Sequence, residues 1–311
     1  MKIVVIGAGG VGGYFGGRLA QAGYSVTFLT RGENLRVIGE HGLKIRSYLG
    51  NVHVYPQVSD DYKVIKDAEL VILAVKSWQI QDIAQKMKAF LALSATVLPL
   101  QNGADNAERL LKVLPAPQVL PGLCKIVSKL ESPGVIDHVT YEPEIVFGEI
   151  DHNGSERLKQ IHALFESAGI KNRVSDHIER DIWLKFLFIV TISALGALTR
   201  SVLGIMRKDD YLRGIMSKTS QEILSIGIAK GVDLRQEDID NCFKIIDQLD
   251  HHTTMSLQRD MMEGKPSELE NFNGFIVHQG DLLQIDTPVN DFIYYTLRPM
   301  EQMARNANPQ R

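Results

Sequence analysis

Residues 1–32 read MKIVVIGAGGVGGYFGGRLAQAGYSVTFLTRG, and this stretch decides the fold of the first half of the chain. An apolar run (2–7) leads into a G-x-G-x-x-G turn, a helical pattern (12–23) and a second apolar run (25–30). A glycine turn between a strand and a helix brings backbone N–H groups at the helix start close to a pyrophosphate. The stretch therefore predicts a Rossmann-type unit that binds a dinucleotide, the alternative being a tight turn without a ligand. The predicted cofactor-binding residues of this turn are Gly7, Gly9, Gly10, Val11 and Gly12.

Arg31 follows the second predicted strand, at the place where NAD-binding proteins carry an acid that accepts hydrogen bonds from the ribose 2′-hydroxyl. A guanidinium instead suits a phosphate, because its planar fork donates two charge-assisted hydrogen bonds. Arg31 therefore favours NADP(H) over NAD(H), the alternative being an arginine whose charge lies in water.

The composition is that of a soluble globular protein with small-molecule or protein partners. The 311 residues suffice for two domains, 44% of them are hydrophobic, and the net charge of −3 gives no general attraction to nucleic acid. The only cysteines, Cys124 and Cys242, are far apart, and no Cys/His cluster has metal-ligand spacing. We expect a reduced, cytoplasmic protein without a metal site.

The first half continues the alternation of strands and helices. Further strands are predicted at 70–75 and 96–101, and helices at 33–41, 79–91 and 105–114. Continuous apolar strands separated by helices predict a parallel sheet covered on both faces, hence an α/β fold. Residues 125–138 show no clear period and are expected to form strand and loop.

The second half is predicted to be all helical. Residues 176–304 have helical spacing, with breaks expected at 204, 231–232, 264–266 and 286–288. The domains are therefore an NADP-binding Rossmann-like domain (1–175) and a helical substrate and dimerisation domain (176–311). The apolar run 182–198 is shorter than the roughly 20 residues that span a bilayer, so we expect a buried core helix and no membrane partner. Residues 306–311 look disordered.

Five later segments, taken in order with the glycine turn, resemble the ketopantoate reductase (2-dehydropantoate 2-reductase) family. The resemblance covers almost the whole chain and implies an NADP-binding Rossmann domain joined to a helical domain, with a 2-oxo acid bound between them. The segments are AVKSWQ (74–79), LQNGADN (100–106), DIWLKF (181–186), SELENFNGF (267–275) and IDTPVND (285–291).

Three basic or amide side chains of these segments are candidates for the site. Lys76 and Asn102 follow two predicted parallel strands, where ligands bind in open α/β sheets, although a solvated lysine and an Asn-Gly turn are alternatives. The resemblance implies that both contact cofactor or substrate near the nicotinamide. Lys185 lies in an apolar helical run, where an ammonium must be paired, reach the surface, or lose its proton more easily. The resemblance implies that Lys185 is the general acid that protonates the carbonyl oxygen.

Glu268 is the second catalytic candidate. The resemblance implies an active-site glutamate here, close to the lysine and the substrate hydroxyl. Ser267 and Glu270 also have the S-x-x-E spacing of a helix capping box, so a purely structural role stays open. Asn273 matches the family's E-x-x-x-x-N-G pattern and is otherwise a helix-packing residue.

The sequence departs from the family where the substrate is expected to bind. The family carries asparagines four and eight residues after the lysine, and this chain has Ile189 and Ser193. Met255 stands in place of the serine that grips the substrate carboxylate, with Thr254 and Ser256 as neighbouring hydroxyls. Ser193, Ser256 and Asn102 are therefore the predicted substrate-binding residues, in a pocket that has lost a hydrogen bond.

The sequence thus predicts NADPH-dependent reduction of a 2-oxo acid. Ketopantoate, reduced to pantoate as in pantothenate biosynthesis, is the first choice. Two alternatives stay open: a related NADP-dependent dehydrogenase of another acid or an imine, and a catalytically silent NADP(H)-binding sensor. The apolar helical half is compatible with a homodimer.

Overall fold

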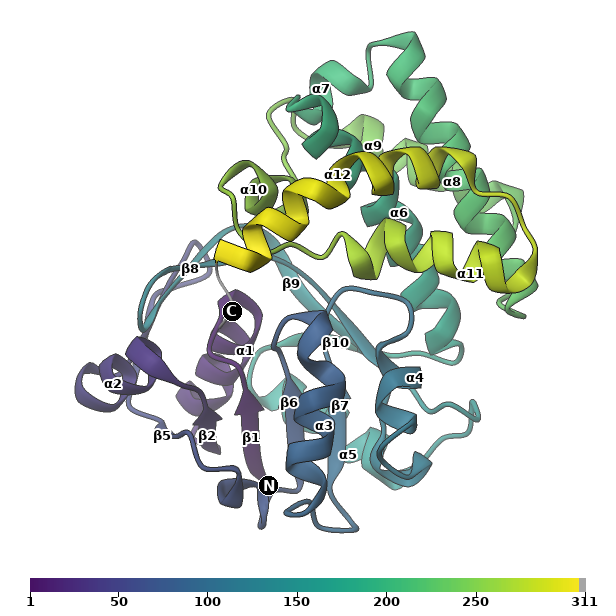
Figure 1. Ribbon diagram of the computed structural model, residues 1–311. Helices are drawn as coiled ribbons and strands as arrows, with labels where there is room; N and C mark the ends of the chain where they lie inside the picture. The colour runs from purple at the N-terminus through teal and green to yellow at the C-terminus, as the bar shows by residue number, and fades with distance from the viewer. Residues whose placement is uncertain (308–311) are drawn as a thin grey trace. The chain divides into compact units, whose positions relative to one another are not determined.

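A computed structural model describes residues 1–307 of the chain as a mixed α/β structure. It divides into two compact units, unit 1 from Met1 to Ile178 and unit 2 beginning at Glu179, whereas the sequence places the boundary between residues 175 and 176. Unit 1 contains a parallel sheet and unit 2 is helical, as predicted (Figure 1).

The first sheet of unit 1, sheet A, has the strand order β5-β2-β1-β6-β7 (Figure 1). All of its neighbouring strands are parallel, which confirms the sheet expected from the alternating pattern. Its strands are β1 (Lys2–Ile6), β2 (Ser25–Leu29), β5 (Gln57–Ser59), β6 (Leu70–Leu73) and β7 (Thr96–Pro99).

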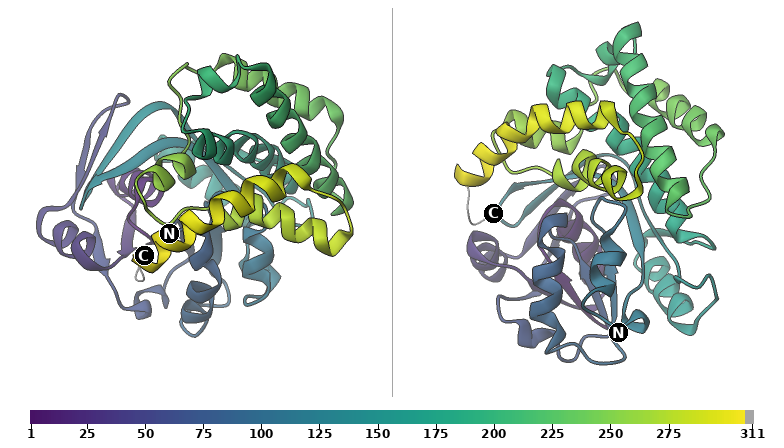
Figure 2. Two further views of the ribbon diagram at one scale, coloured as in Figure 1. Left: turned by 45° about the horizontal axis from the view of Figure 1, so that its top comes forward. Right: turned by 45° about the vertical axis from the view of Figure 1, so that its right-hand side comes forward.

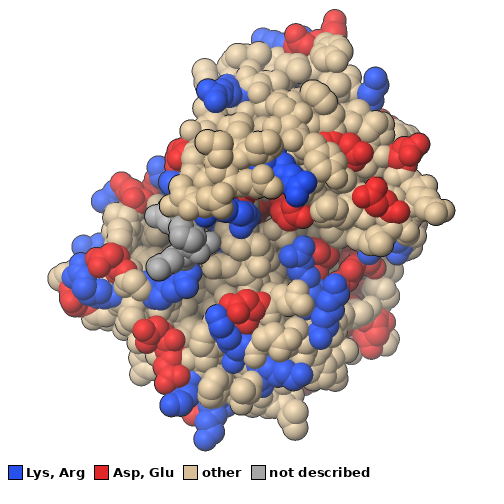
Figure 3. Space-filling view, in the orientation of Figure 1, with Lys and Arg blue, Asp and Glu red and all other residues tan. Residues whose placement is uncertain are grey.

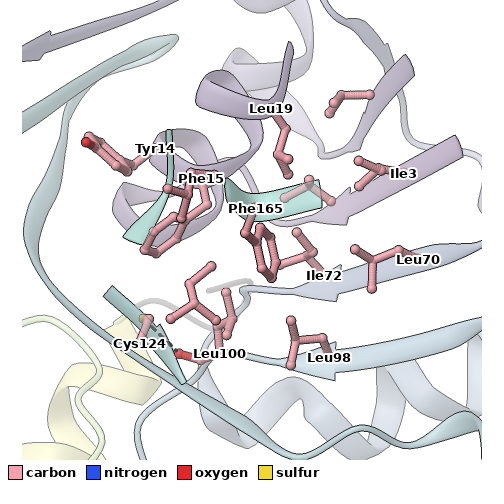
Figure 4. Close-up of a cluster of buried hydrophobic side chains, with 14 of the residues drawn as sticks. Ile3, Tyr14, Phe15, Leu19, Leu70, Ile72, Leu98, Leu100, Cys124 and Phe165 are labelled. Atoms are coloured by element: carbon pink, nitrogen blue, oxygen red, sulfur yellow. Dashed lines mark hydrogen bonds between the residues drawn. The ribbon is translucent and has the colours of Figure 1, made fainter. Parts of the chain in front are cut away.

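Side chains of successive strand residues enter separate hydrophobic cores on the two faces of sheet A, because the side-chain period of a strand is two. Ile3 and Val5 pack on the face covered by α1 and α5, where Phe15 and Phe165 lie (Figure 4). Val4 enters the core on the other face, with residues of α3, α4 and η1. The helical elements of this unit are α1 (Gly10–Gln21), α2 (Gly32–His41), η1 (Tyr62–Ile65), η2 (Ser77–Gln79), α3 (Ile80–Lys88), α4 (Asn106–Leu111), η3 (Ala116–Gln118) and α5 (Glu156–Ser167).

A second sheet, sheet B, is absent from the sequence prediction. Its strand order is β10-β9-β3-β4, and β8 pairs with β9 as a long antiparallel hairpin. Residues 125–138, expected to be strand and loop, are almost entirely strand, and much of their surface is exposed on both faces, which removes a clear burial period. The strands are β3 (Leu43–Ser47), β4 (Val52–Val54), β8 (Gly122–Ser132), β9 (Val135–Phe147) and β10 (Lys171–Val174).

Helix α1 is buried between the two sheets, and its glycines make this possible. A Cβ at Gly16 would lie 2.5 Å from Phe28 of sheet A, and one at Gly17 would lie 2.6 Å from Ile45 of sheet B. Gly12 and Gly13, one turn earlier, face sheets A and B in the same way. Two i, i+4 glycine pairs therefore let both sheets approach one helix closely.

Unit 2 consists of helices, and α8, α11 and α12 pack on one another (Figure 2). The breaks expected at 231–232, 264–266 and 286–288 are confirmed, but Gly204 lies inside α7, and the chain turns instead at Arg200, whose φ is +53°. Helix α12 continues to Ala307, so residues 306 and 307 are helical, and 308–311 of the predicted disordered tail lie outside the described residues. The elements are α6 (Ile178–Thr199), α7 (Leu203–Met206), α8 (Asp210–Ala229), α9 (Gln236–Gln248), α10 (Ser256–Met262), the π-helical turn η4 (Glu270–Gly274), α11 (Phe275–Leu283) and α12 (Pro288–Ala307).

Helix α6 is the one helix of residues 1–307 that is long and apolar enough to cross a membrane, with a mean hydropathy of 1.9 in its most apolar window. That window is 67% buried within the protein. Trp183 and Phe186, both 1% exposed, pack edge to face within it. This burial is typical of the core helix that the sequence predicts.

Candidate active site

The candidate residues of unit 1 lie in loops that leave the same edge of sheet A. Parallel strands end at one edge, and backbone hydrogen bonds continue the register past the strand ends. Gly7 N donates to Leu29 O at 3.0 Å, Ala74 N to Ile6 O at 2.9 Å, and Leu100 N to Leu73 O at 2.9 Å. The loops that carry Arg31, the glycines, Lys76 and Asn102 therefore follow one another along this edge, in the strand order β2, β1, β6, β7.

The glycine turn has the geometry of a phosphate cradle. Gly7 has a φ of +101°, which strains any other residue, and a Cβ at Gly12 would lie 2.0 Å from the Gly7 carbonyl oxygen. At Gly9, the N-cap of α1, a Cβ would meet no atom of residues 1–307 within 4 Å. The first turn of α1 therefore presents N–H groups beside open space, which fits a pyrophosphate.

Strand β8 closes the far side of this turn. A Cβ at Gly10 would lie 2.7 Å from the carbonyl oxygen of Ser128 in β8. Earlier in the same strand, the Cys124 thiol donates to Leu100 O at 3.4 Å, at the end of β7 (Figure 4). β8 thus passes both the end of β7 and the start of α1, so sheet B helps to shape the cradle.

Arg31 is exposed at the end of β2, where it is the N-cap of α2. Burial raises the pKa of the Tyr62 hydroxyl, and the positive charges of Lys86 and Arg31 oppose this shift. Both cations therefore act on the same hydroxyl. Lys86 also bonds Asp82 at 2.7 Å, which holds its ammonium in place. Arg31 and Lys86 thus both lower the pKa of the Tyr62 hydroxyl and Asp82 raises it, and of these residues the sequence predicted only the arginine.

Lys76 and Asn102 follow β6 and β7. Lys76 is exposed, its backbone N–H donates to Gln79 Oε1 at 3.2 Å, and its ammonium lies 5.7 Å from the Trp78 ring centroid. Asn102 is half-buried and precedes Gly103, whose φ of +131° makes the turn that the Asn-Gly pair predicts.

Lys185, in unit 2, is half-buried on α6. Its sequence neighbour Phe186 packs edge to face on Phe272, with ring centroids 6.2 Å apart, and on Phe275 at 5.7 Å. Phe272 N donates to Glu268 O at 3.0 Å. The aromatic packing therefore brings the helix that carries Lys185 against the segment that carries Glu268.

The backbone before Glu268 is fixed by a buried carboxylate on α12. Glu301, 5% exposed, accepts hydrogen bonds from Ser267 N at 3.0 Å and from Ser267 Oγ at 2.6 Å. Arg305 donates to Glu301 at 2.7 Å and to Ser267 O at 3.1 Å. These four interactions, which we call the Glu301 clamp, fix the residue that precedes buried Glu268.

The capping box considered for Ser267 and Glu270 does not form. Ser267 Oγ donates to Glu301 and accepts from Leu269 N at 3.3 Å rather than from the residue 270 N–H. The Glu270 carboxylate accepts from Tyr294 Oη at 2.6 Å and from His278 Nε2 at 2.9 Å. Residues 270–274 form a π-helical turn rather than a standard first turn, and such turns are frequent at functional sites. The capping prediction failed because tertiary partners on α11 and α12 outcompete the local bonds.

Asn273 belongs to a buried network rather than a simple packing contact. Its Nδ2 donates to Asn290 Oδ1 at 2.9 Å. Glu222 of α8 accepts hydrogen bonds from Asn290 Nδ2 at 2.7 Å and from the N–H groups of Val289 and Asn290, each at 2.9 Å. The network links η4 and α8 to the first turn of α12.

Both halves of the chain match models of one known family. The model described as "Ketopantoate reductase PanE/ApbA" matches residues 3–152, and that described as "Ketopantoate reductase PanE/ApbA C terminal" matches residues 177–301. The chain belongs to the ketopantoate reductase family. This confirms the resemblance seen in the sequence and identifies a family of oxidoreductases.

Relatives within the family match over nearly their whole length. An uncharacterized oxidoreductase, YkpB, from Bacillus subtilis (strain 168) is 31% identical over 301 residues, 97% of this chain and 99% of the relative. A 2-dehydropantoate 2-reductase from Pyrococcus abyssi is 26% identical over 304 residues, with coverage of 97% and 99%.

Solved structures show the same fold. The PanE/ApbA family ketopantoate reductase from Ralstonia eutropha JMP134 has a TM-score of 0.90 and 30% identity, covering 98% of this chain and 100% of that one. The ternary structure of D-mandelate dehydrogenase with NADH and anilino(oxo)acetate has a TM-score of 0.89 at 22% identity, covering 98% and 100%. The latter likeness is one of fold alone.

The residues that depart from the ketopantoate reductase pattern lie on α6 and around the start of α10. Ile189 is 5% exposed, and the Ser193 hydroxyl, 1% exposed, donates to the Ile189 carbonyl one turn earlier in α6. Thr254 accepts from Arg259 at 3.2 Å through its hydroxyl, Met255 is the N-cap of α10, and Ser256 is the first residue of that helix. Thr254 is thus tied to its own segment.

Proposed function

We propose that this protein reduces a small 2-oxo acid with NADPH, and that ketopantoate, reduced to pantoate, is its substrate. Family membership supports the reaction class. Within unit 2, the observation that carries the proposal is the packing of Phe186 on Phe272, which brings the segments of Lys185 and Glu268 together. An ammonium and a carboxylate on adjoining segments are the groups that a carbonyl reduction needs for proton supply.

The chain's own residues divide the work of binding and proton transfer. NADPH, when bound, supplies the hydride. The glycine turn would hold the pyrophosphate, and Lys76 and Asn102, further along the same edge, would contact the nicotinamide half. The Lys185 ammonium stabilises the negative charge that develops on the substrate carbonyl oxygen and donates a proton to it. Glu268, held by the Glu301 clamp, orients the lysine and the substrate hydroxyl.

The choice of NADPH over NADH is supported by the charges around the end of β2. Arg31 stands where an acid would accept from a ribose 2′-hydroxyl, and Lys86 brings a second positive charge to the same Tyr62 hydroxyl. Two cations favour a 2′-phosphate. The Lys86 ammonium is held by its ion pair with Asp82, at 2.7 Å.

A second candidate substrate class follows from Ile189. An apolar, buried side chain stands one helical turn from Lys185, where the family has an asparagine. This position favours a 2-oxo acid with a larger apolar side chain. The cytoplasmic location, the homodimer, and the substrate contacts of Ser193 and Ser256 stay predictions.

The test is a panel of 2-oxo acids, with ketopantoate and with branched and aromatic side chains, assayed with NADPH and NADH in parallel. We expect turnover with NADPH, a strong preference over NADH, and a loss of about 10²–10⁴-fold in kcat for Lys185→Ala with unchanged NADPH affinity. Lys218→Ala, at an exposed lysine of α8, is the matched control and should keep full activity. Tight NADPH binding without turnover of any acid would favour the silent sensor, and an NADH preference would refute the role of Arg31.

A further inference from the structure

The side-chain amide of Gln101 is buried without a hydrogen-bond partner among residues 1–307. Gln101 follows β7 and is 7% exposed, and neither its Nε2 nor its Oε1 has a hydrogen-bond partner among residues 1–307. An amide removed from water without hydrogen bonds is costly, so native proteins keep few of them. Such a group points to a ligand that completes its bonds.

Further buried polar atoms of the same loop are in the same state. The Oδ1 atoms of Asp105 and Asn106 also lack hydrogen-bond partners within the described residues. Burial raises the pKa of Asp105, which Arg109 opposes through its ion pair at 2.6 Å. The loop between β7 and α4 thus concentrates unsatisfied polar atoms, which is typical of a binding site.

The loop is nevertheless held firmly. Asn106 Nδ2 donates to Gln101 O at 2.9 Å, and Arg109 N donates to Asp105 O at 2.9 Å. The Gln101 backbone is therefore fixed by its own loop, while its side-chain amide has no hydrogen-bond partner among residues 1–307. A buried amide without hydrogen bonds persists only where the surrounding structure enforces it, and each such group calls for an explanation such as a bound ligand.

The chemistry of the amide identifies the kind of group it would bind. A glutamine amide donates through Nε2 and accepts through Oε1. The carboxylate and keto oxygens of a 2-oxo acid only accept, and ketopantoate adds a single hydroxyl that can also donate. The nicotinamide half of a dinucleotide carries a carboxamide and ribose hydroxyls, each of which both donates and accepts.

The position of Gln101 agrees with that half. Gln101 leaves the same edge of sheet A as the glycine turn, but from β7, two strands away from β1. Arg31 leaves from β2, on the other side of β1. Neighbouring strands are about 4.8 Å apart, so the two loops start about 14 Å apart along the edge, which places them at opposite ends of an extended ligand.

We propose that the Gln101 amide binds the carboxamide or ribose hydroxyls of the nicotinamide half of the bound dinucleotide. This inference rests on the proposed function, because it requires that the protein bind NADPH. It adds a residue to the site and assigns that residue to the cofactor, not to the 2-oxo acid.

The test compares two buried glutamines of unit 1. Gln101→Leu removes the unsatisfied amide, whereas Gln118→Leu removes an amide that is 4% exposed and donates to Ala92 O at 2.7 Å. Each variant is unfolded in urea without ligand, and binding is titrated with NADPH and with adenosine 2′,5′-bisphosphate, a probe that lacks the nicotinamide half.

We expect Gln101→Leu to retain or gain stability, to bind NADPH about tenfold more weakly, and to bind the bisphosphate as the wild type does. Gln118→Leu should lose stability and keep its NADPH affinity, because it breaks a hydrogen bond away from the loop.

Three results would overturn the proposal. If Gln101→Leu binds NADPH as tightly as the wild type does, the amide does not bind the cofactor. If, in addition, the KM of the 2-oxo acid rises, the amide binds the substrate instead. If NADPH and the bisphosphate weaken equally, the substitution distorts the whole edge of the sheet. If the wild type binds no NADPH at all, the proposed function itself has failed.

Discussion

Glu301→Gln is expected to reduce both stability and catalysis, although Glu301 lies on α12 and far along the chain from Lys185. The wild-type carboxylate accepts from Ser267 N, Ser267 Oγ and Arg305 Nε at 3.0, 2.6 and 2.7 Å. A glutamine offers one acceptor oxygen in place of two and turns an NH₂ group toward these donors. At least one buried donor is then left without a partner, at about 1–3 kcal/mol, and the remaining bonds lose their charge assistance. We expect the free energy of unfolding to fall by about 2–4 kcal/mol.

The effect on catalysis follows from the position of Ser267 directly before Glu268. A displacement of about 1 Å at a reacting group costs on the order of a hundredfold in rate, so a loosened clamp should lower kcat by about ten- to hundredfold. NADPH affinity should not change, because the cofactor-binding turn lies in unit 1. The assay is steady-state reduction of the best 2-oxo acid, with urea unfolding and NADPH titration on the same preparations.

Glu149→Gln is the matched control. Glu149 is a carboxylate of unit 1, 8% exposed, that likewise accepts from a serine and an arginine, Ser155 at 2.5 Å and Arg157 at 2.7 Å. It should lose similar stability with kcat unchanged. Equal losses of kcat in the two variants, or a normal kcat in a destabilised Glu301→Gln, would refute the positioning role of the Glu301 clamp.

Other predictions concern the glycine turn, acid stability and thiol reactivity. Gly12→Ala should abolish NADPH binding or folding, since its Cβ would lie 2.0 Å from the Gly7 carbonyl oxygen. Gly17→Ala is the control, because its Cβ would meet only the flexible end of the Ile45 side chain, at 2.6 Å. This variant should lower the free energy of unfolding in urea by about 1–3 kcal/mol and still bind NADPH. Burial alone would raise the pKa of Glu149, but hydrogen bonds from Arg157 and a serine outweigh it and lower the pKa below the usual 4.5. The ionised Glu149 carboxylate therefore stabilises the fold above pH 4.5, and this contribution is lost as the pH falls through the lowered pKa of the folded state. Between pH 5 and 3, the urea midpoint of Glu149→Gln should decline less than that of the wild type. Burial raises the pKa of Cys242 to about 12, so iodoacetamide at pH 8 should label this thiol, by mass spectrometry, only after unfolding; rapid labelling of the folded chain would contradict the burial.

The elements that the sequence predicts well are those with a strong local cause. Strands β1, β6 and β7 of sheet A are almost wholly buried apolar runs, whereas β5, whose sequence is Gln-Val-Ser, is partly exposed and is not predicted from the sequence. The turn after β1 needs a glycine because Gly7 has a φ of +101°. Arg31, Lys76 and Asn102 could be located because parallel strands end at one edge, so a strand prediction also places the residue that follows it.

The elements that the sequence misses depend on distant partners. β8 and β9 carry polar and apolar residues on exposed faces, and only their pairing with each other and with β3 makes them strands. The π-helical turn after Glu268 depends on partners in α11 and α12, so its local S-x-x-E spacing is misleading. No local sequence pattern marks Lys86 or Gln101. Lys86 is recognised only by its electrostatic effect on Tyr62, and Gln101 only by a buried side-chain amide without a hydrogen-bond partner among residues 1–307.

On the face shown in Figure 3, basic and acidic side chains lie among one another, so this face carries no extended field of one sign. The net charge of −3 agrees with this view.

Helix α12 is tied to the rest of unit 2 near both of its ends as well as at Tyr294. Glu222 of α8 accepts from the N–H groups of Val289 and Asn290, and Glu301, further along the helix, accepts from Ser267. Opening of α12 would break both sets of hydrogen bonds together, which raises the free energy that local opening requires. A chain shortened before residue 288 would keep Lys185 and Glu268 in its sequence but lose the groups that hold the segment of Glu268. The amides of residues 267–274 should therefore exchange with solvent faster in the shortened chain than in the full one.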